Sequence, residues 1–128
     1  MNVVDPQIES LRLPPHSIEA EQSVLGGLLL DNSALEHISD ILSEDDFYRH
    51  DHRVIWRHVC KIINLDRPAD VVTIYESLET EGKAEEIGGL AYLNALAQNT
   101  PSAANIRRYA EIVRERAMLR KLVSIADE

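Results

Sequence analysis

Apolar residues recur every three or four positions along most of this chain, the spacing that places side chains on one face of an α-helix. The pattern predicts helices over residues 18–30, 34–42, 52–65, 71–81, 87–98 and from 103 to the end of the chain. No stretch alternates apolar and polar residues with a sustained period of two, the pattern of a strand. The predicted fold class is all-α, a compact helical bundle followed by a long C-terminal helix.

Polar residues mark where these helices should begin. A short polar side chain directly before a helix accepts hydrogen bonds from the free backbone N–H groups of the first turn. The residues expected to do this are Ser17, Asp51, Asp70 and Ser102. Residues 43–46 (SEDD) resemble a capping box that opens a short turn. Gly82 is expected to end the 71–81 helix.

The apolar positions also predict the core. The 52–65 helix is apolar over more than half of its circumference, so we expect it at the centre of the core. The side chains expected to point inward from the 34–42 and 87–98 helices are Leu35, Ile38, Leu42, Leu90, Leu93, Leu96 and Ala97. Gly26 and Gly27 lie in the middle of an apolar helix, where each costs about 1 kcal/mol relative to alanine. Close helix–helix approach explains them, and contact within the domain is favoured over contact between subunits.

The last predicted helix has more apolar surface than one contact can bury. One stripe contains Ile106, Tyr109, Val113 and Ala117, and a second contains Ile112, Leu119, Leu122, Val123 and Ala126. A surface helix normally buries a single stripe against its own core. The second stripe therefore predicts a partner helix, either from further sequence or from another subunit. Because no glycine or proline stops the helix, we expect the chain to be a piece of a longer protein.

The chain has 128 residues and a net charge of −9, so generic binding to nucleic-acid phosphates is not expected. Its basic residues concentrate near the end of the chain, at Arg107, Arg108, Arg114, Arg116, Arg120 and Lys121. Two interpretations stay open for this stretch. It is either a solvated face with intrahelical pairs such as Arg107–Glu111, or a docking strip for an acidic partner surface.

Candidate catalytic and metal-binding residues are few. Gly82-Lys83 is followed by Ala84 and lacks the P-loop spacing, so no nucleotide site and no cofactor are expected in this chain. His50, His52 and His58 do not form the ligand set of a metal site, and we expect none.

The chain has one cysteine, Cys60, which lies in an apolar helix and should behave as a small hydrophobic residue. A single cysteine and the absence of an apolar run near 18 residues favour a cytoplasmic protein without a membrane span.

Six stretches, in order, resemble the DnaB family of bacterial replicative DNA helicases. Residues 14–27 (PPHSIEAEQSVLGG) resemble the opening signature of the family's N-terminal domain. The others are Asp46-Phe47-Tyr48 with His52-Arg53 and Ile55, residues 68–73 (PADVVT), 88–93 (GGLAYL), 99–106 (NTPSAANI), and Tyr109-Ala110 with 112–117 (IVRERA). The resemblance covers residues 14 to 128.

The resemblance implies a non-catalytic N-terminal domain that forms a collar above a motor ring. It implies a helical bundle over 16–100 and a helix over 101–128 that is the first arm of a helical hairpin, while Pro6, Pro14 and Pro15 predict a flexible arm over residues 1–15. A linker and a motor domain binding ATP and magnesium would follow. The implied partners are primase and other helicase subunits, as dimers within a hexamer, with a helicase loader as a further candidate.

Two sets of site residues follow from exposure patterns rather than from a motif. The residues expected to contact primase or another domain are Glu19, Tyr92, Arg107, Arg108 and Arg114. Those expected to mediate self-association are Ile112, Leu119, Leu122 and Val123. An alternative is the helicase-binding domain of a primase, but the 14–27 signature resembles the helicase. A second alternative is a single-strand binder that uses the basic helix, which the acidic remainder of the chain disfavours.

Overall fold

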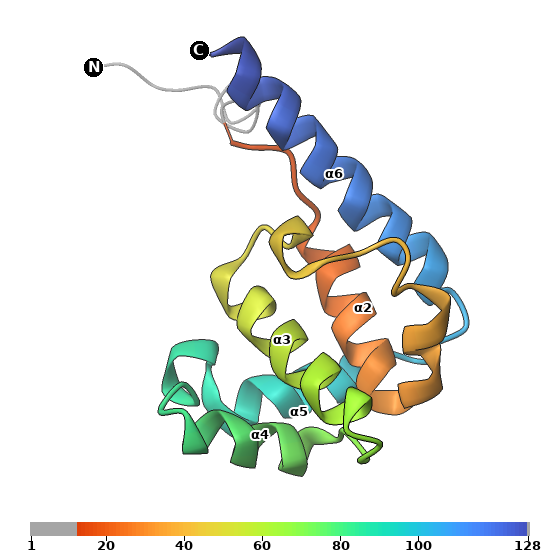
Figure 1. The fold of residues 1–128 in the computed structure, drawn as a ribbon, viewed down its shortest axis with the longest axis vertical. Coiled ribbons are helices and arrows are strands. Elements are labelled where there is room, and N and C mark those ends of the chain that lie inside the picture. Colours follow the sequence, from red (N-terminus) through yellow and green to blue (C-terminus); the bar gives the residue numbers. More distant parts are fainter. Residues whose placement is uncertain (1–12, 128) are drawn as a thin grey trace.

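The computed structural model describes residues 13–127, in which every regular element is a helix (Figure 1). The α-helices are α2 (Ile18–Leu30), α3 (His50–Asn64), α4 (Val71–Thr80), α5 (Gly89–Asn99) and α6 (Ile106–Ala126). Three short 3-10 helices lie between them: η1 (Asn32–His37), η2 (Glu44–Asp46) and η3 (Glu85–Ile87). The all-α prediction is confirmed. Residues 1–12 of the predicted flexible arm (1–15) lie outside the described residues.

Helix α2 is the centre of the bundle and packs against α3, α5 and α6. It is buried on more than one face, because residues 24–30 are all apolar and Ala20 and Glu21 are buried as well. Helix α3 covers one side of it and also contacts α4, whereas α5 connects α4 back to α2. We predicted the 52–65 helix as the core centre, but that position belongs to α2, which α3 flanks.

Gly26 allows α5 to approach the backbone of α2. A Cβ atom at Gly26 would overlap the Thr100 hydroxyl and the Leu96 carbonyl oxygen, and would lie 2.9 Å from Thr100 Cβ. At Gly27 the nearest atom to such a Cβ would be Ile106 Cδ1 of α6, at 3.1 Å. Both glycines therefore serve contacts inside the domain, which confirms the favoured interpretation.

Two of the four predicted caps are confirmed. Ser17 Oγ accepts from the N–H of Ala20 at 3.2 Å, and Asp70 Oδ1 accepts from the N–H of Thr73 at 2.8 Å. The capping box is also present, since Asp46 Oδ2 accepts from the N–H of Ser43 at 2.9 Å.

The other two predicted caps are wrong. Helix α3 begins at His50, so Asp51 lies inside its first turn, where the Arg49 guanidinium binds its carboxylate. Ser102 Oγ accepts from the N–H of Ala104 at 3.3 Å, which makes a separate turn and delays the start of α6 to Ile106.

Two further predicted helices differ from those expected. The 34–42 segment is the 3-10 helix η1 followed by turns, because Asp31 and Asn32 hold its start. The Asn32 side chain donates to the carbonyls of Leu28 and Ala69, both at 2.8 Å. Leu35, Ile38 and Leu42 are nevertheless buried as predicted.

The 87–98 segment is broken near its start. Gly88 has a φ of 92°, a left-handed conformation that separates η3 from α5. The break changes which side chains point inward: Leu93 and Leu96 are buried, but Leu90 is 41% exposed and that prediction is wrong. Gly82 follows α4 with a φ of 71°, as a helix-ending glycine should.

Helix α6 lies against the bundle with its first half and extends away from it with its second half (Figure 1). The residues of α6 that enter the core are Ile106, Ala110, Val113 and Ala117. Arg120 marks the limit of this contact. Its Nη1 donates to the carbonyl of Pro15 at 2.8 Å, and its Nη2 donates to the carbonyl of Asp46 at 2.7 Å.

Candidate docking pocket and exposed helix face

A carboxylate is buried inside the bundle at the start of α2. Glu21 is 1% exposed and accepts three hydrogen bonds, which compensate the cost of removing its charge from water. Glu21 Oε2 accepts from the N–H of Tyr48 at 2.7 Å, and Oε1 lies 2.7 Å from His52 Nδ1. The third and longest bond comes from the N–H of Arg49, at 3.4 Å.

His52 of α3 is fully buried and connects Glu21 to Tyr92 of α5. Its Nε2 lies 2.6 Å from the Tyr92 hydroxyl oxygen, and the two rings stack with centroids 5.9 Å apart. Gln22 Nε2 donates to the same hydroxyl at 3.2 Å. Burial is the main cause that raises the pKa of Tyr92, so its hydroxyl stays protonated. One polar network therefore joins α2, α3 and α5.

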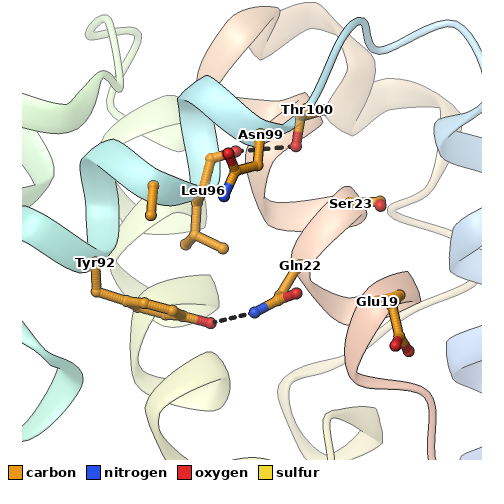
Figure 2. Close-up of a pocket in the computed structure, with 8 residues that line it drawn as sticks. Glu19, Gln22, Ser23, Tyr92, Leu96, Asn99 and Thr100 are labelled. Atoms are coloured by element: carbon orange, nitrogen blue, oxygen red, sulfur yellow. Dashed lines mark hydrogen bonds between the residues drawn. The ribbon is translucent and has the colours of Figure 1, made fainter.

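This network ends at a pocket of about 200 Å³ between α2 and α5 (Figure 2). Glu19, Gln22 and Ser23 line it from α2, while Tyr92, Ala95, Leu96 and Asn99 line it from α5, with Thr100 beyond. In Figure 2 the Tyr92 hydroxyl and the Gln22 amide point toward each other across the pocket. Most lining residues offer hydrogen-bonding groups, so the pocket suits a polar side chain or a peptide backbone.

The second candidate region is the outer half of α6, residues 118–126. Its large apolar side chains are exposed in this chain: Met118, Leu119, Leu122, Val123 and Ile125. Leu122, for example, is 62% exposed. A contiguous apolar face of this kind marks a protein contact. Ile112 differs from the other predicted self-association residues because it packs partly against the core.

Several basic residues of α6 have partners within the domain. Arg114 is not the free group we expected, because its Nη1 lies 2.9 Å from Oδ1 of the buried Asp46. Arg107 donates to the carbonyl of His37 at 2.7 Å. The expected Arg107–Glu111 pair is replaced by Arg108–Glu111, at 3.6 Å. Arg107 and Arg108 remain exposed on α6, whereas Glu19 and Tyr92 lie together at the pocket.

The histidines and the cysteine have structural surroundings. His58 is buried, with Nδ1 2.7 Å from Ser77 Oγ and Nε2 3.0 Å from Glu81 Oε2 outside hydrogen-bond alignment. Burial lowers the pKa of His58 and raises the pKa of the Cys60 thiol to about 11. Among residues 13–127, no three histidine, cysteine or acidic side chains are arranged to hold a metal ion. Within the same residues, no helix is long and apolar enough to cross a membrane.

Comparison with known proteins identifies the family. Residues 13–115 match the family model described as the DnaB-like helicase N-terminal domain. The chain belongs to this family. The match is to the helicase, which supports that interpretation over a primase domain.

Members of the DnaB family are similar over almost the whole chain. The replicative DNA helicase DnaB of Buchnera aphidicola subsp. Baizongia pistaciae is 50% identical over 98% of this chain and 27% of the relative. The crystal structure of the DnaB N-terminal domain from Mycobacterium tuberculosis superposes with a TM-score of 0.87 at 40% identity, covering 90% of this chain and 80% of that one.

A solved structure of a DnaB-like replicative helicase, described with its interactions with primase, has a TM-score of 0.75 at 25% identity. It covers 87% of this chain and 26% of that one. The chain spans about a quarter of the length of the curated DnaB relatives that it matches.

Sequence reasoning missed the residues behind the α2/α5 pocket. We assigned no role to Glu21 from the sequence and considered His52 only as a metal ligand, an interpretation that we rejected. The available signal was the position of Glu21 beside Ala20 and four residues before the buried Leu25, which places a charge on an apolar face. Arg120 left no such signal, because its partners are carbonyl groups distant in the sequence.

Proposed function

We propose that this chain is the collar domain of a replicative DNA helicase, a non-catalytic module for subunit assembly and primase docking. The observation that carries the proposal is the exposed apolar outer half of α6 on a domain of the DnaB-like family. Leu119, Leu122 and Val123 would pair with a second hairpin arm or with another subunit, and Ile112 would contribute less because it already contacts the core. The resulting dimers would assemble within a hexamer.

Primase would dock at the α2/α5 pocket, where Glu19 and Tyr92 provide the contacts. The DnaB-like helicase described with its primase interactions supports primase as the partner, and the polar lining of the pocket supports this location. Arg107 and Arg108 are further contact candidates on α6, and Arg114 would act indirectly by fixing α6 to Asp46. A helicase loader is an additional candidate partner. The whole cytoplasmic protein would bind ATP and magnesium in a separate motor domain, and this chain would use no cofactor.

Sedimentation equilibrium over a concentration series tests both parts of the proposal. The chain alone should form a dimer, and adding the C-terminal domain of the cognate primase should produce a heavier complex. A strict monomer that ignores the primase domain contradicts the proposal.

A matched pair of charge reversals tests the docking location. Glu19→Lys places a cation at the pocket and should weaken primase binding at least about tenfold. Glu36→Lys makes the same change on an exposed acid of η1, away from the pocket lining, and should leave binding within about twofold of the unmodified chain. Equal effects of the two substitutions would show that net charge, rather than the pocket, controls binding.

A further inference from the structure

Glu21 and His52 form a fully buried pair of ionisable side chains in the centre of a small domain. A pair of this kind contributes little net stability, because desolvation offsets much of the attraction between its members. An apolar pair of similar volume would fill the same space without that cost. Core packing alone therefore does not explain the network. The order of its hydrogen bonds, from Glu21 through His52 to Tyr92, provides an explanation.

The direction of the network follows from the chemistry of its members. An ionised carboxylate only accepts hydrogen bonds, so Nδ1 of His52 donates to Glu21 Oε1 across 2.7 Å. That bond orients the imidazole and points Nε2 at the Tyr92 hydroxyl, 2.6 Å away. Tyr92 is thus held at its hydroxyl by a ring whose own orientation is set by a buried charge.

Tyr92 is also restrained on its ring. One side stacks on His52, and the Arg49 guanidinium lies 5.3 Å from the ring centroid. Arg49 is itself held by Asp51 in α3. The hydroxyl end of Tyr92 faces Gln22, which lines the pocket with it (Figure 2). Every restraint on this residue therefore fixes the shape of the pocket wall.

We propose that Glu21 and His52 are positioning residues, which hold Tyr92 in the orientation that a docked primase domain meets. The inference rests on the proposed docking function and adds two residues that no partner can touch. A wall fixed before binding lowers the cost of ordering side chains when the complex forms. Loss of His52 should therefore weaken docking although the docking surface keeps all of its own residues.

Four variants test the inference by their dissociation constants for the primase C-terminal domain. His52→Gln and Tyr92→Phe should each weaken binding about five- to tenfold, the effect of losing one buried hydrogen bond. The double variant should bind about as weakly as Tyr92→Phe, because Tyr92→Phe already removes the hydroxyl that His52 holds.

His58→Gln is the matched control. His58 is also a buried imidazole of α3, but it contacts Ser77 and Glu81. This variant should bind within about twofold of the unmodified chain, since neither contact lines the α2/α5 pocket. Equal effects of the two histidine substitutions, or additive effects of His52→Gln and Tyr92→Phe, would overturn the inference.

An NMR measurement separates this inference from the proposed function. In a tyrosine-labelled sample without partner, His52→Gln should broaden or shift the Tyr92 ring signals and leave those of Tyr75 unchanged. Unchanged Tyr92 signals overturn the inference even where primase binds. If the unmodified chain does not bind primase, the proposed function fails, and the Tyr92 signals still decide whether His52 holds that ring. If His52→Gln does not fold, Tyr92→Phe compared with Tyr75→Phe decides whether the hydroxyl contact controls docking.

Discussion

The two halves of α6 share one residue pattern and have different surroundings. Both halves carry basic residues and apolar residues at helical spacing, and both are helical. Residues 106–117 bury one stripe against α2 and η2, whereas residues 118–126 expose a comparable apolar stripe. Helical periodicity therefore predicts the secondary structure of a segment. The elements packed against that segment decide whether its apolar face stabilises the domain or remains available for assembly.

If the stability of the domain depends on close packing around α2, adding one carbon atom there should have the largest effect on the free energy of unfolding. Gly26→Ala would force a methyl group into Thr100 and the Leu96 carbonyl, and should lower the free energy of unfolding by about 3 kcal/mol. Gly27→Ala meets only the flexible end of Ile106 and gains helix propensity, so its effect should stay below about 1 kcal/mol. Urea denaturation measures both. Equal losses would mean that α5 does not approach α2 as closely as described.

If association is located in the outer half of α6, shortening it should separate assembly from folding. Leu119→Ala with Leu122→Ala should weaken self-association about a hundredfold and change the unfolding free energy by less than about 1 kcal/mol. Ile106→Ala in the inner half should instead cost about 3 kcal/mol of stability. Sedimentation equilibrium and urea denaturation give the two quantities. A double leucine variant that unfolds would place these leucines in the core.

The attachment of the inner half to the bundle can be tested through its arginines. Arg114→Ala leaves the buried carboxylate of Asp46 without its guanidinium partner and should destabilise the chain by about 1 kcal/mol, since Arg114 is partly exposed. Arg108→Ala removes only an exposed pair with Glu111 and should cost less than about 0.5 kcal/mol. Thermal unfolding resolves the difference. A larger loss of stability in Arg108→Ala than in Arg114→Ala would contradict the role of Arg114 in holding α6 to Asp46.

The smallest expected effect concerns pH. Burial holds the pKa of His58 below its ordinary value of 6.5, so the unfolded chain binds this proton more readily than the folded one. The contribution of His58 to stability is therefore complete above that value and is lost as the pH falls below it. His58→Gln should flatten the fall in melting temperature between about pH 7.5 and 5.5. Parallel curves for the two proteins would contradict the assigned pKa direction.

The elements whose signals are local were predictable from the sequence. Ser17 and Asp70 cap helices because their partners lie three residues away, and the α6 stripes follow from spacing alone. The errors have long-range or competing causes. Arg49 binds the Asp51 carboxylate, and the Asn32 side chain reaches Ala69 across 37 residues. The pocket itself was not predicted, although Glu19 and Tyr92, predicted as contact residues, both line it. Glu21 and His52 could not be found in this way, because they acquire their roles only when α2, α3 and α5 meet.

Arg120 connects the outer half of α6 to two segments that are distant in the sequence. Its guanidinium donates to the carbonyls of Pro15 and Asp46, so a displacement of α6 at this point would either move that backbone or break the two hydrogen bonds. Pro15 lies two residues before the Ser17 cap of α2, the helix that carries Glu19 and Gln22 into the pocket. A displacement of α6 by a subunit bound at Leu122 would therefore reach the start of α2 through one side chain. The exposed face of α6 and the α2/α5 pocket would then be mechanically coupled.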